Sequence, residues 1–491
     1  MSVVNDFLMR HNLAPECVDM DKLTEGFLAE MKMGLDGKGG SLEMIPTFVS
    51  EDCDIQPGQS VIVLDAGGTN FRTCLVTFDE ELKPVISDFR KVGMPGVKQE
   101  VSAKEFFGIL ADNVERLIDK SDRIGFCFSY AANITPEHDG IPIIFSKEIK
   151  APEVVGMPVA ASLLKELKER GYNVERLIDK SDRIGFCFSY AANITPDHDG
   201  IPIIFSKEIK APEVVGMPVA ASLLKELKER GYNVENKKFS VVNDTVATLL
   251  ATKAGCSDPA SGYVGFILGT GTNTAYTELN SKILKIDGCK CGKQIINVES
   301  GNYDLALGDF DREYFNTTKN AERYHFEKMI SGAYLGGFAT FVINKAIEEG
   351  IFSDEFAKRF KSIEGGLTTT TMSFYLEKCH NMDYDLVKCV DGNEDDALKL
   401  WLIIRSIIER AAKLTAVNLS SAVLKTDAGK NPRYPVIINA DGTTFYKTEF
   451  LKKYTEIYLH EFLEKKHGRF IKMVRIDDSP VLGAAIAGLS V

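Results

Sequence analysis

The chain has 491 residues, of which 44% are hydrophobic and 26% are charged. This composition is typical of a globular protein and excludes disordered, collagenous and coiled-coil chains. The 70 acidic and 58 basic residues give a net charge of −12, which argues against nucleic acid or an anionic membrane as the main partner.

Targeting signals and cysteine usage predict where the chain works. No apolar run is long enough to span a bilayer, and the first residues lack the basic and apolar regions of a secretory signal. Ten cysteines in a chain of this length are too sparse for a disulfide scaffold. We therefore expect a reduced, cytoplasmic protein with no membrane partner.

In chain order, hydrophobic periodicity and glycine turns predict alternating helices and strands. Helices are expected at 3–11, 21–34, 103–120, 160–170 with its copy 220–230, 319–349, 395–425 and 482–489. Strands are expected at 60–66, 71–78, 85–92, 124–130 with its copy 184–190, 237–244, 263–269 and 434–440. Such alternation favours α/β layers.

The largest feature of the sequence is an internal duplication. Residues 113–175 and 173–235 are the same at an offset of 60, except that Glu137 is replaced by Asp197. Repeat architectures need about three or more units, so two copies indicate a recent tandem duplication or an assembly error in the sequence. We expect one copy to occupy the sheet, without being able to choose which, and the other to leave it as an appendage.

A first candidate phosphate loop follows the strand that begins at residue 60. The strand ends near Asp65, and the turn Gly67-Gly68-Thr69-Asn70 leads into Phe71 and Arg72. Glycines let backbone N–H groups approach phosphate oxygens, and a carboxylate beside them can hold Mg²⁺ through water. A plain hairpin with a glycine turn explains the same residues equally well.

A second glycine turn, Gly269-Thr270-Gly271-Thr272-Asn273, follows another apolar strand. One such turn is weak evidence for nucleotide binding. Two turns at strand ends suit the two ends of a triphosphate, with threonine hydroxyls donating to phosphate oxygens.

The pair Asn243-Asp244 lies at the end of the strand that begins at residue 237. Ligands bind at the carboxyl ends of strands in open α/β sheets, and an aspartate there can accept a hydroxyl proton during phosphoryl transfer. The alternative is that one of the two residues only caps the following helix.

The duplicated segment carries hydroxyl and ammonium groups suited to a polyol and to phosphoryl charge. They are Ser129 and its copy Ser189, and the pairs Ser146-Lys147 and Ser206-Lys207. A Ser-Lys pair alone is most often a solvated surface.

Further candidates are carboxylates and turns later in the chain. Glu299 and Glu327 could accept hydrogen bonds from sugar hydroxyls, or could be surface residues. The turns Asp441-Gly442-Thr443 and Asp478-Ser479-Pro480 are candidate nucleotide contacts. Cys289-Lys290-Cys291 lacks a second ligand pair, so we predict no metal site there.

Taken together and in this order, these motifs resemble the hexokinase family, within the actin-like ATPase-domain superfamily of sugar kinases. The segments that carry the resemblance are LEMIPTFV, LDAGGTNFR, IGFCFSY with FSKEI, VVNDTVATL, GTGTN, NVESG, FEKMISGAYLG and NADGTTFYK. The resemblance implies a two-lobed, actin-like ATPase (ribonuclease H-like) α/β fold with mixed sheets flanked by helices. Its large lobe would comprise 1–56 and 245–475, and its small lobe 57–244, which includes the duplicated segments 113–172 and 173–235, with helix 476–491 returning to the small lobe.

The resemblance also implies roles for residues. Asp244 would be the general base toward the 6-hydroxyl of a hexose, assisted by Lys207 or Lys147. The sugar would be held by Asn243, Asn273, Glu299 and Glu327, with Ser189 and Ser206 or their copies Ser129 and Ser146. Mg²⁺ and ATP would be held by Asp65, Gly67, Gly68, Thr69, Asn70, Arg72, Gly269, Thr270, Gly271, Thr272, Asp441, Gly442, Thr443 and Ser479.

The implied function is ATP-dependent phosphorylation of glucose, or of mannose or fructose, feeding glycolysis by a monomer or homodimer. The chain departs from the family at 188–191, Phe-Ser-Tyr-Ala for Phe-Ser-Phe-Pro, and at 205–208, Phe-Ser-Lys-Glu for Trp-Thr-Lys-Gly. These changes reshape the sugar loop and leave the preferred hexose open. A sugar sensor without transfer activity is a rival that Asp244 argues against, and an actin-like ATPase is a rival that the sugar segment argues against.

Overall fold

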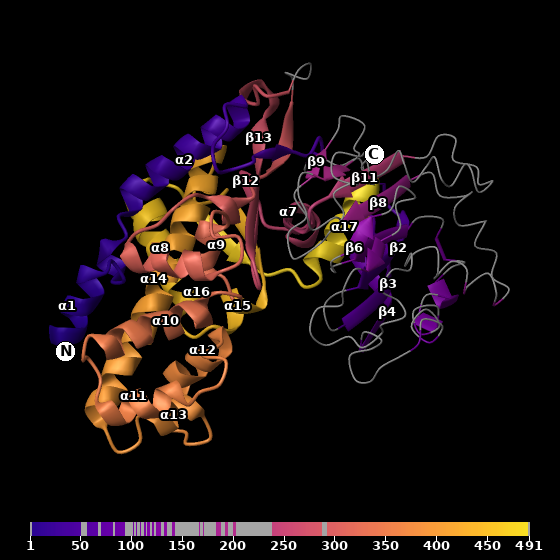
Figure 1. Ribbon diagram of the computed structural model, residues 1–491. Helices are drawn as coiled ribbons and strands as arrows, with labels where there is room; N and C mark the ends of the chain where they lie inside the picture. The colour runs from indigo at the N-terminus through magenta and orange to yellow at the C-terminus, as the bar shows by residue number, and fades with distance from the viewer. Residues whose placement is uncertain are drawn as a thin grey trace. The chain divides into compact units, whose positions relative to one another are not determined.

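The computed structural model describes residues 2–50, 56–66, 70–81, 84–93, 238–286 and 292–489, with short stretches between 102 and 202. The chain divides into two compact units (Figure 1). Unit 1 comprises Met1–Met44, Pro259–Lys290 and Val298–Arg475, and unit 2 comprises Ile45–Asp258, Cys291–Asn297 and Ile476–Val491. The boundary expected at residue 244 falls inside unit 2, at the start of helix α7 (Asp244–Gly255).

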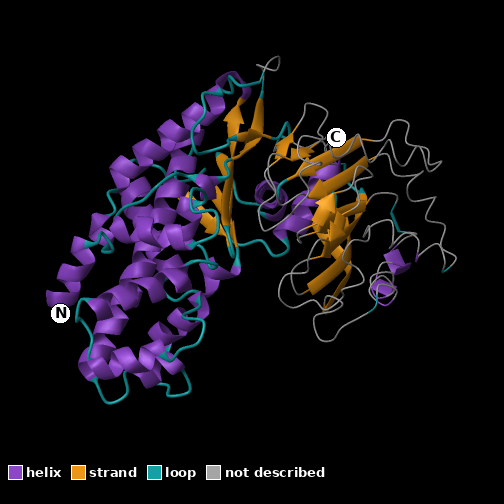
Figure 2. Cartoon of the chain, viewed as in Figure 1, coloured by secondary structure: helices purple, strands orange, loops and turns teal. Residues whose placement is uncertain are grey.

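Helices dominate unit 1, whereas strands form the centre of unit 2 (Figure 2). The helices of unit 1 are α1 (Ser2–Arg10), α2 (Met20–Asp36), α8 (Asp309–Thr317), α9 (His325–Ile330), α10 (Leu335–Glu348), α11 (Asp354–Lys361), α12 (Thr369–Glu377), α13 (Asp385–Cys389), α14 (Glu394–Thr426), α15 (Thr443–Lys447) and α16 (Leu451–Leu459). Its four strands lie in the order β13 (Thr272–Leu279), β12 (Gly262–Leu268), β15 (Val436–Asp441) and β16 (Ile471–Val474).

Helix α14 is the central element of unit 1. The side chain of Asn393 caps it by accepting from the N–H of Asp396 at 3.1 Å. From Leu400 to Val423 most of its side chains are buried, which is the pattern of a helix surrounded by protein on nearly all sides. The helix expected at 395–425 is therefore confirmed, and it supplies a rigid support for the neighbouring strands.

Unit 2 is built on a six-stranded mixed sheet. Its order is β11 (Lys238–Val242), β8 (Arg183–Cys187), β5 (Ile124–Phe128), β2 (Ser60–Ala66), β3 (Asn70–Phe78) and β4 (Pro84–Gly93). The first four are mutually parallel, and β2, β3 and β4 form an antiparallel meander. Smaller hairpins are β6 (Ala132–Ile134) with β7 (Gly140–Pro142) and β9 (Ala192–Ile194) with β10 (Gly200–Pro202), and β1 (Ile45–Pro46) pairs with β14 (Lys293–Asn297).

The expectation that one copy of the duplication would leave the sheet is wrong. Strands β5 and β8 are the same strand of the two copies, and they pair in parallel with Ile124 opposite Ile184 and Cys127 opposite Cys187. An open parallel sheet can accept an additional strand because each strand needs only a neighbour with free backbone donors and acceptors. Both copies are therefore built into the sheet, with β8 beside β11.

One expected helix differs from the structure, and three others cannot be compared with it. The stretch 319–349 forms two helices, α9 and α10, because residues 331–334 leave the helix so that Gly332 can meet the turn at Gly269. The helix expected at 103–120 and the pair at 160–170 and 220–230 lie largely outside the described residues.

The C-terminal helix α17 (Ser479–Leu489) packs on α7 and on the sheet of unit 2 (Figure 1). The contact is so close that a Cβ on Gly483 would overlap the backbone of Ala247. Glycine at 483 is therefore required for this approach, which fixes the helix that begins at Asp244.

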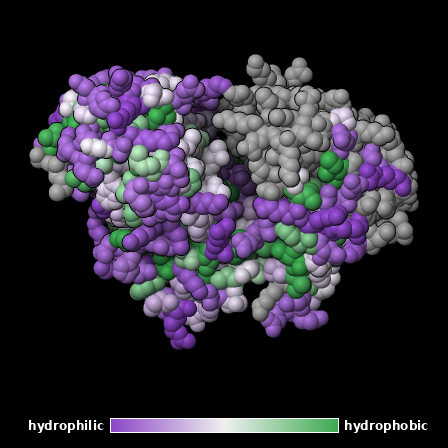
Figure 3. Space-filling model, turned by 90° about the horizontal axis from the view of Figure 1, so that it is seen from below, coloured by the Kyte–Doolittle hydropathy of each residue, from purple (hydrophilic) through white to green (hydrophobic). Residues whose placement is uncertain are grey.

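One face of the molecule is drawn by hydropathy in Figure 3. On the face drawn in Figure 3, hydrophobic residues are interspersed among hydrophilic ones. Among the described residues, no helix combines the length and apolar character needed to cross a membrane.

Candidate active site

The parallel strands of unit 2 end at one edge of its sheet. In register, Ala66 of β2 lies opposite Phe128 of β5, and Val242 of β11 lies opposite Cys187 of β8. The first phosphate loop, the two serine segments and Asn243-Asp244 all follow these strand ends in the chain. This edge is where ligands bind in open α/β sheets.

Several expected site residues lie outside the described residues: Gly67, Gly68, Thr69, Ser129, Ser146, Lys147, Ser189, Ser206 and Lys207. Asp65 is placed by its backbone in β2, opposite Arg72 of β3, and Asn70 begins β3. The guanidinium of Arg72 lies 3.6 Å from the carboxylate of Asp478.

Asn243 and Asp244 form the junction between β11 and α7. The side-chain oxygen of Asn243 accepts from the N–H of Thr245 at 2.8 Å and caps the helix. Asp244 is half-buried, its Oδ1 accepts from the same N–H at 2.8 Å, and it lies at the positive end of the helix dipole. The capping role raised as an alternative thus belongs to Asn243, and the carboxylate of Asp244 stays partly accessible.

The second glycine turn of unit 1 joins β12 to β13. Its first and third residues are linked by a hydrogen bond from the N–H of Gly269 to the carbonyl of Gly271 at 2.9 Å. The carbonyl of Gly269 also accepts from the N–H of Gly332 at 2.9 Å and from the hydroxyl of Thr444 at 2.8 Å. The turn is therefore held rigidly, while Thr270 at its tip is exposed.

Asp441 and Gly442 lie beside this turn because β15 runs parallel to β12. Ile267 lies opposite Asp441, and Gly442 has φ 113°, where a Cβ would collide with the carbonyl of Leu268. Only glycine fits this position. The structure thus brings together two expected nucleotide motifs, 269–272 and 441–443.

The expected sugar-binding carboxylates of unit 1 lie next to the same turn. The N–H of Thr272 donates to Oε2 of Glu327 at 3.0 Å, and Nδ2 of Asn273 donates to Oε1 of Glu299 at 3.4 Å. A Cβ on Gly271 would lie 2.5 Å from Oε2 of Glu327, so glycine leaves the space that this carboxylate occupies. Asn273, Glu299 and Glu327 therefore form one cluster of an amide and two carboxylates.

Glu299 has a strained backbone, with φ 57° in the left-handed region. A non-glycine residue in this region costs on the order of 1 kcal/mol or more, and such strain is concentrated at functional sites. The strain at Glu299 supports a role for its side chain in binding.

One residue of this site was not anticipated from the sequence. Asn418 of α14 is fully buried, and its Nδ2 lies 2.8 Å from the hydroxyl of Thr274. That hydroxyl lies 3.2 Å from the hydroxyl of Ser300. Asn418 thus supports the direct neighbours of both Asn273 and Glu299. Nothing in the local pattern of α14 singles it out, because its partner Thr274 is far away in the chain.

The last expected nucleotide residue, Ser479, has an internal role. It is fully buried at the start of α17, and its hydroxyl donates to the carbonyl of Ile476 at 2.6 Å. Its predicted contact with nucleotide stays a prediction. Among the described residues, no group of three His, Cys, Asp or Glu side chains is arranged to hold a metal ion, and Cys289 and Cys291 lie outside them.

Two family models together match nearly the whole chain. One model described as hexokinase matches residues 8–179 and 175–254, and a second matches residues 263–490. The chain belongs to the hexokinase family. The first model matches in two pieces that meet within the duplication, as expected if the family needs this segment only once.

Individual hexokinases resemble the chain over nearly its full length. It is 27% identical to Hexokinase-2 of Schizosaccharomyces pombe, over 99% of this chain and 95% of the relative. It is 25% identical to Hexokinase-7 of Oryza sativa, over 97% of this chain and 95% of the relative. The structure of a hexokinase from Schistosoma mansoni complexed with glucose matches with a TM-score of 0.68 at 22% identity, covering 100% of this chain and 99% of that chain. The chain therefore has the hexokinase fold, and it is a hexose-phosphorylating kinase.

Proposed function

We propose that this hexokinase transfers the terminal phosphoryl group of ATP to the 6-hydroxyl of glucose, with mannose or fructose as further substrates, and that its product feeds glycolysis. The observation that carries the proposal is the cluster of Asn273, Glu299 and Glu327 beside a rigid glycine turn. Carboxylates and amides hold hydroxyl groups in fixed directions, and a site built for hydroxyl groups strongly rejects ligands without them.

In this mechanism Asp244 accepts the proton of the attacking hydroxyl. Its position at the end of β11 and the start of α7 supports the role, since the carboxylate is half-buried and oriented by the N–H of Thr245. The 6-hydroxyl oxygen forms a bond to phosphorus as the bond from phosphorus to the leaving oxygen of the nucleotide breaks, and the proton passes to Asp244.

The glycine turns suit a nucleotide phosphate chain. The turn at 269–271 exposes Thr270 while its backbone is held from behind, and Gly442 allows close approach beside it. Bound ATP supplies the phosphoryl group, and Mg²⁺ would neutralise its charge with Asp65 as the candidate oxygen ligand. Lys147 or Lys207 would add positive charge on the sugar side.

The direct test is release of ADP, followed with a coupled assay, against glucose, mannose, fructose and galactose. We expect turnover with at least one of the first three and little ADP release without sugar. Release of ADP that is independent of every hexose would contradict the proposal and favour a plain ATPase.

A further inference from the structure

The two carboxylates proposed to hold the hexose stand on separate segments of unit 1. Glu299 precedes the short helical turn Ser300–Asn302, and Glu327 lies in α9. Each segment contains a residue with a left-handed backbone, Glu299 at φ 57° and Tyr324 at φ 60°. A side chain that contacts both segments can therefore influence the positions of both carboxylates.

Glu43 contacts the first segment through Asn302. Nδ2 of Asn302 lies 3.2 Å from Oε1 and 3.1 Å from Oε2 of Glu43. Among the described residues, Oδ1 of Asn302 has no hydrogen-bond partner, so Glu43 is what orients the amide. The backbone N–H of Asn302 in turn donates to the carbonyl of Glu299 at 3.0 Å and closes the turn.

The same carboxylate contacts the second segment through Arg323. Nη2 of Arg323 lies 3.4 Å from Oε1 of Glu43. The next residue, Tyr324, accepts at its carbonyl from the N–H of Lys328 at 2.9 Å, which is the first turn of α9 around Glu327. The backbone of Glu43 is itself held, because Nζ of Lys285 donates to its carbonyl at 2.6 Å.

We propose that Glu43 is a positioning residue for hexose binding. Its carboxylate links the turn at Glu299 to the start of α9 through contacts with Asn302 and Arg323. This inference rests on the proposed roles of Glu299 and Glu327 in holding the sugar. It goes beyond them because Glu43 is proposed to act on Glu299 and Glu327 only through Asn302 and Arg323.

The link between the two segments requires a carboxylate at position 43 rather than an amide. Both oxygens of Glu43 face N–H donors, because Nδ2 of Asn302 contacts Oε1 and Oε2 and Arg323 contacts Oε1. Glutamine has the same shape but only one acceptor oxygen, and its amide N–H groups would face a donor. Burial raises the pKa of Glu43, and the hydrogen bond from Asn302 and the charge of Arg323 offset this rise only in part.

The test is steady-state kinetics of Glu43→Gln and Glu43→Asp, with Glu409→Gln as a matched control. Glu409 is also half-buried in unit 1, and it accepts from the hydroxyl of Tyr458 at 2.8 Å. Its spacing from Asn418 along α14 places the two residues on different faces of this helix. We expect Glu43→Gln to raise the hexose KM about five- to twentyfold, with kcat and the ATP KM within about twofold of the parent. Glu43→Asp should recover at least half of the loss on a logarithmic scale, and Glu409→Gln should leave all three constants unchanged.

Two results would overturn the proposal. One is a hexose KM within twofold of the parent in Glu43→Gln. The other is a similar fall in kcat and a similar rise in both KM values in Glu43→Gln and in Glu43→Asp, which is what general damage to the fold produces. Assays of the parent protein separate the two proposals. Failure of the parent to phosphorylate any hexose contradicts the proposed function. An active parent with a normal Glu43→Gln variant contradicts only the positioning role of Glu43.

Discussion

Oε2 of Glu327 accepts a hydrogen bond from the backbone N–H of Thr272 at 3.0 Å. This contact joins the proposed sugar-binding carboxylate to the turn proposed to hold phosphate. A carboxylate has about four lone-pair sites, and this contact uses one of them.

Replacing Glu327 with glutamine should therefore weaken hexose binding. A hydrogen bond to a charged group contributes about 1.5–3 kcal/mol, so we expect the hexose KM to rise about 10- to 100-fold while the ATP KM changes little. The measurement is steady-state kinetics with each substrate varied in turn. The exposed Glu322 provides the control Glu322→Gln, and an unchanged hexose KM in the Glu327 variant would remove this residue from the site.

Replacing Asn418 with alanine should destabilise unit 1 and loosen the sugar cluster. The change removes the contact of Asn418 with the buried hydroxyl of Thr274, which keeps only its contact with the hydroxyl of Ser300, at a cost of about 1–3 kcal/mol in the free energy of unfolding. Urea denaturation measures the stability, and kinetics should show a higher hexose KM. Ser421→Ala is the control, since that buried hydroxyl donates to the carbonyl of Val417 within α14. A wild-type hexose KM would show that Asn418 does not support the cluster.

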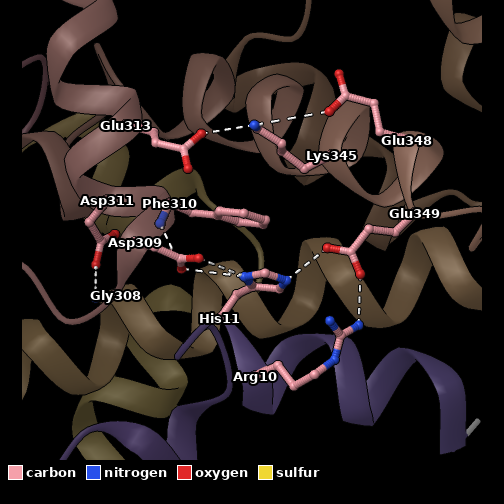
Figure 4. Close-up of polar contacts among 10 residues, drawn as sticks. All are labelled: Arg10, His11, Gly308, Asp309, Phe310, Asp311, Glu313, Lys345, Glu348 and Glu349. Atoms are coloured by element: carbon pink, nitrogen blue, oxygen red, sulfur yellow. Dashed lines mark hydrogen bonds and ion pairs between the residues drawn. The ribbon is translucent and has the colours of Figure 1, made fainter.

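The N-terminal helix is attached by a pH-sensitive contact. Nδ1 of His11 lies 3.1 Å from Oδ2 of Asp309, and its Nε2 lies 2.8 Å from Oε1 of Glu349, with the ring stacked on Phe310 (Figure 4). Burial alone would raise the pKa of Asp309 and of Glu349, but hydrogen bonds from His11, and for Glu349 also from Arg10, outweigh it and hold both pKa values below the usual range.

A lowered carboxylate pKa stabilises the fold above the ordinary carboxylate pKa of about 4, and the stabilisation is lost as the pH falls through the lowered value. We expect His11→Phe, which keeps the stacked ring, to be less stable than the parent at pH 6, with the difference shrinking below about pH 4. Urea denaturation at several pH values tests this. A difference in stability that is independent of pH would contradict the role of the ion pairs.

Deleting residues 113–172 should leave a folded, active enzyme with one strand fewer. The two copies pair in register, so β8 can take the place of β5 beside β2 with the same side chains opposite Ile62 and Leu64. Soluble yield, thermal melting and turnover per molecule should be at least those of the full chain. Loss of folding or activity would show that both copies are needed.

Much of the fold follows from local pattern. The three strands expected between 60 and 92 are confirmed as β2, β3 and β4, because alternating apolar residues and the turns between them define strands locally. The break between α9 and α10 was missed because Gly332 leaves the helix only to reach Gly269, a partner far away in the chain. The place of the second repeat was missed because identical strands carry identical patterns.

In the candidate site, too, some residues could be predicted from local motifs and others depend on partners that are distant in the chain. Asn273, Glu299 and Glu327 were predicted from motifs, and the structure brings them together. Glu43 lies in the segment LEMIPTFV, but that segment assigned it no role, and Asn418 lies in none of the motifs. Their importance depends on partners such as Asn302 and Thr274, which only the folded chain brings next to them.

The most direct test of the account is turnover of Asp244→Ala with glucose, measured by the coupled assay, together with glucose binding by calorimetry. General-base assistance contributes about 10²- to 10⁴-fold, so we expect kcat to fall by that factor while the glucose Kd stays within a few-fold of the parent. Near-normal kcat in this variant would contradict the assignment of Asp244 as the residue that accepts the proton of the 6-hydroxyl.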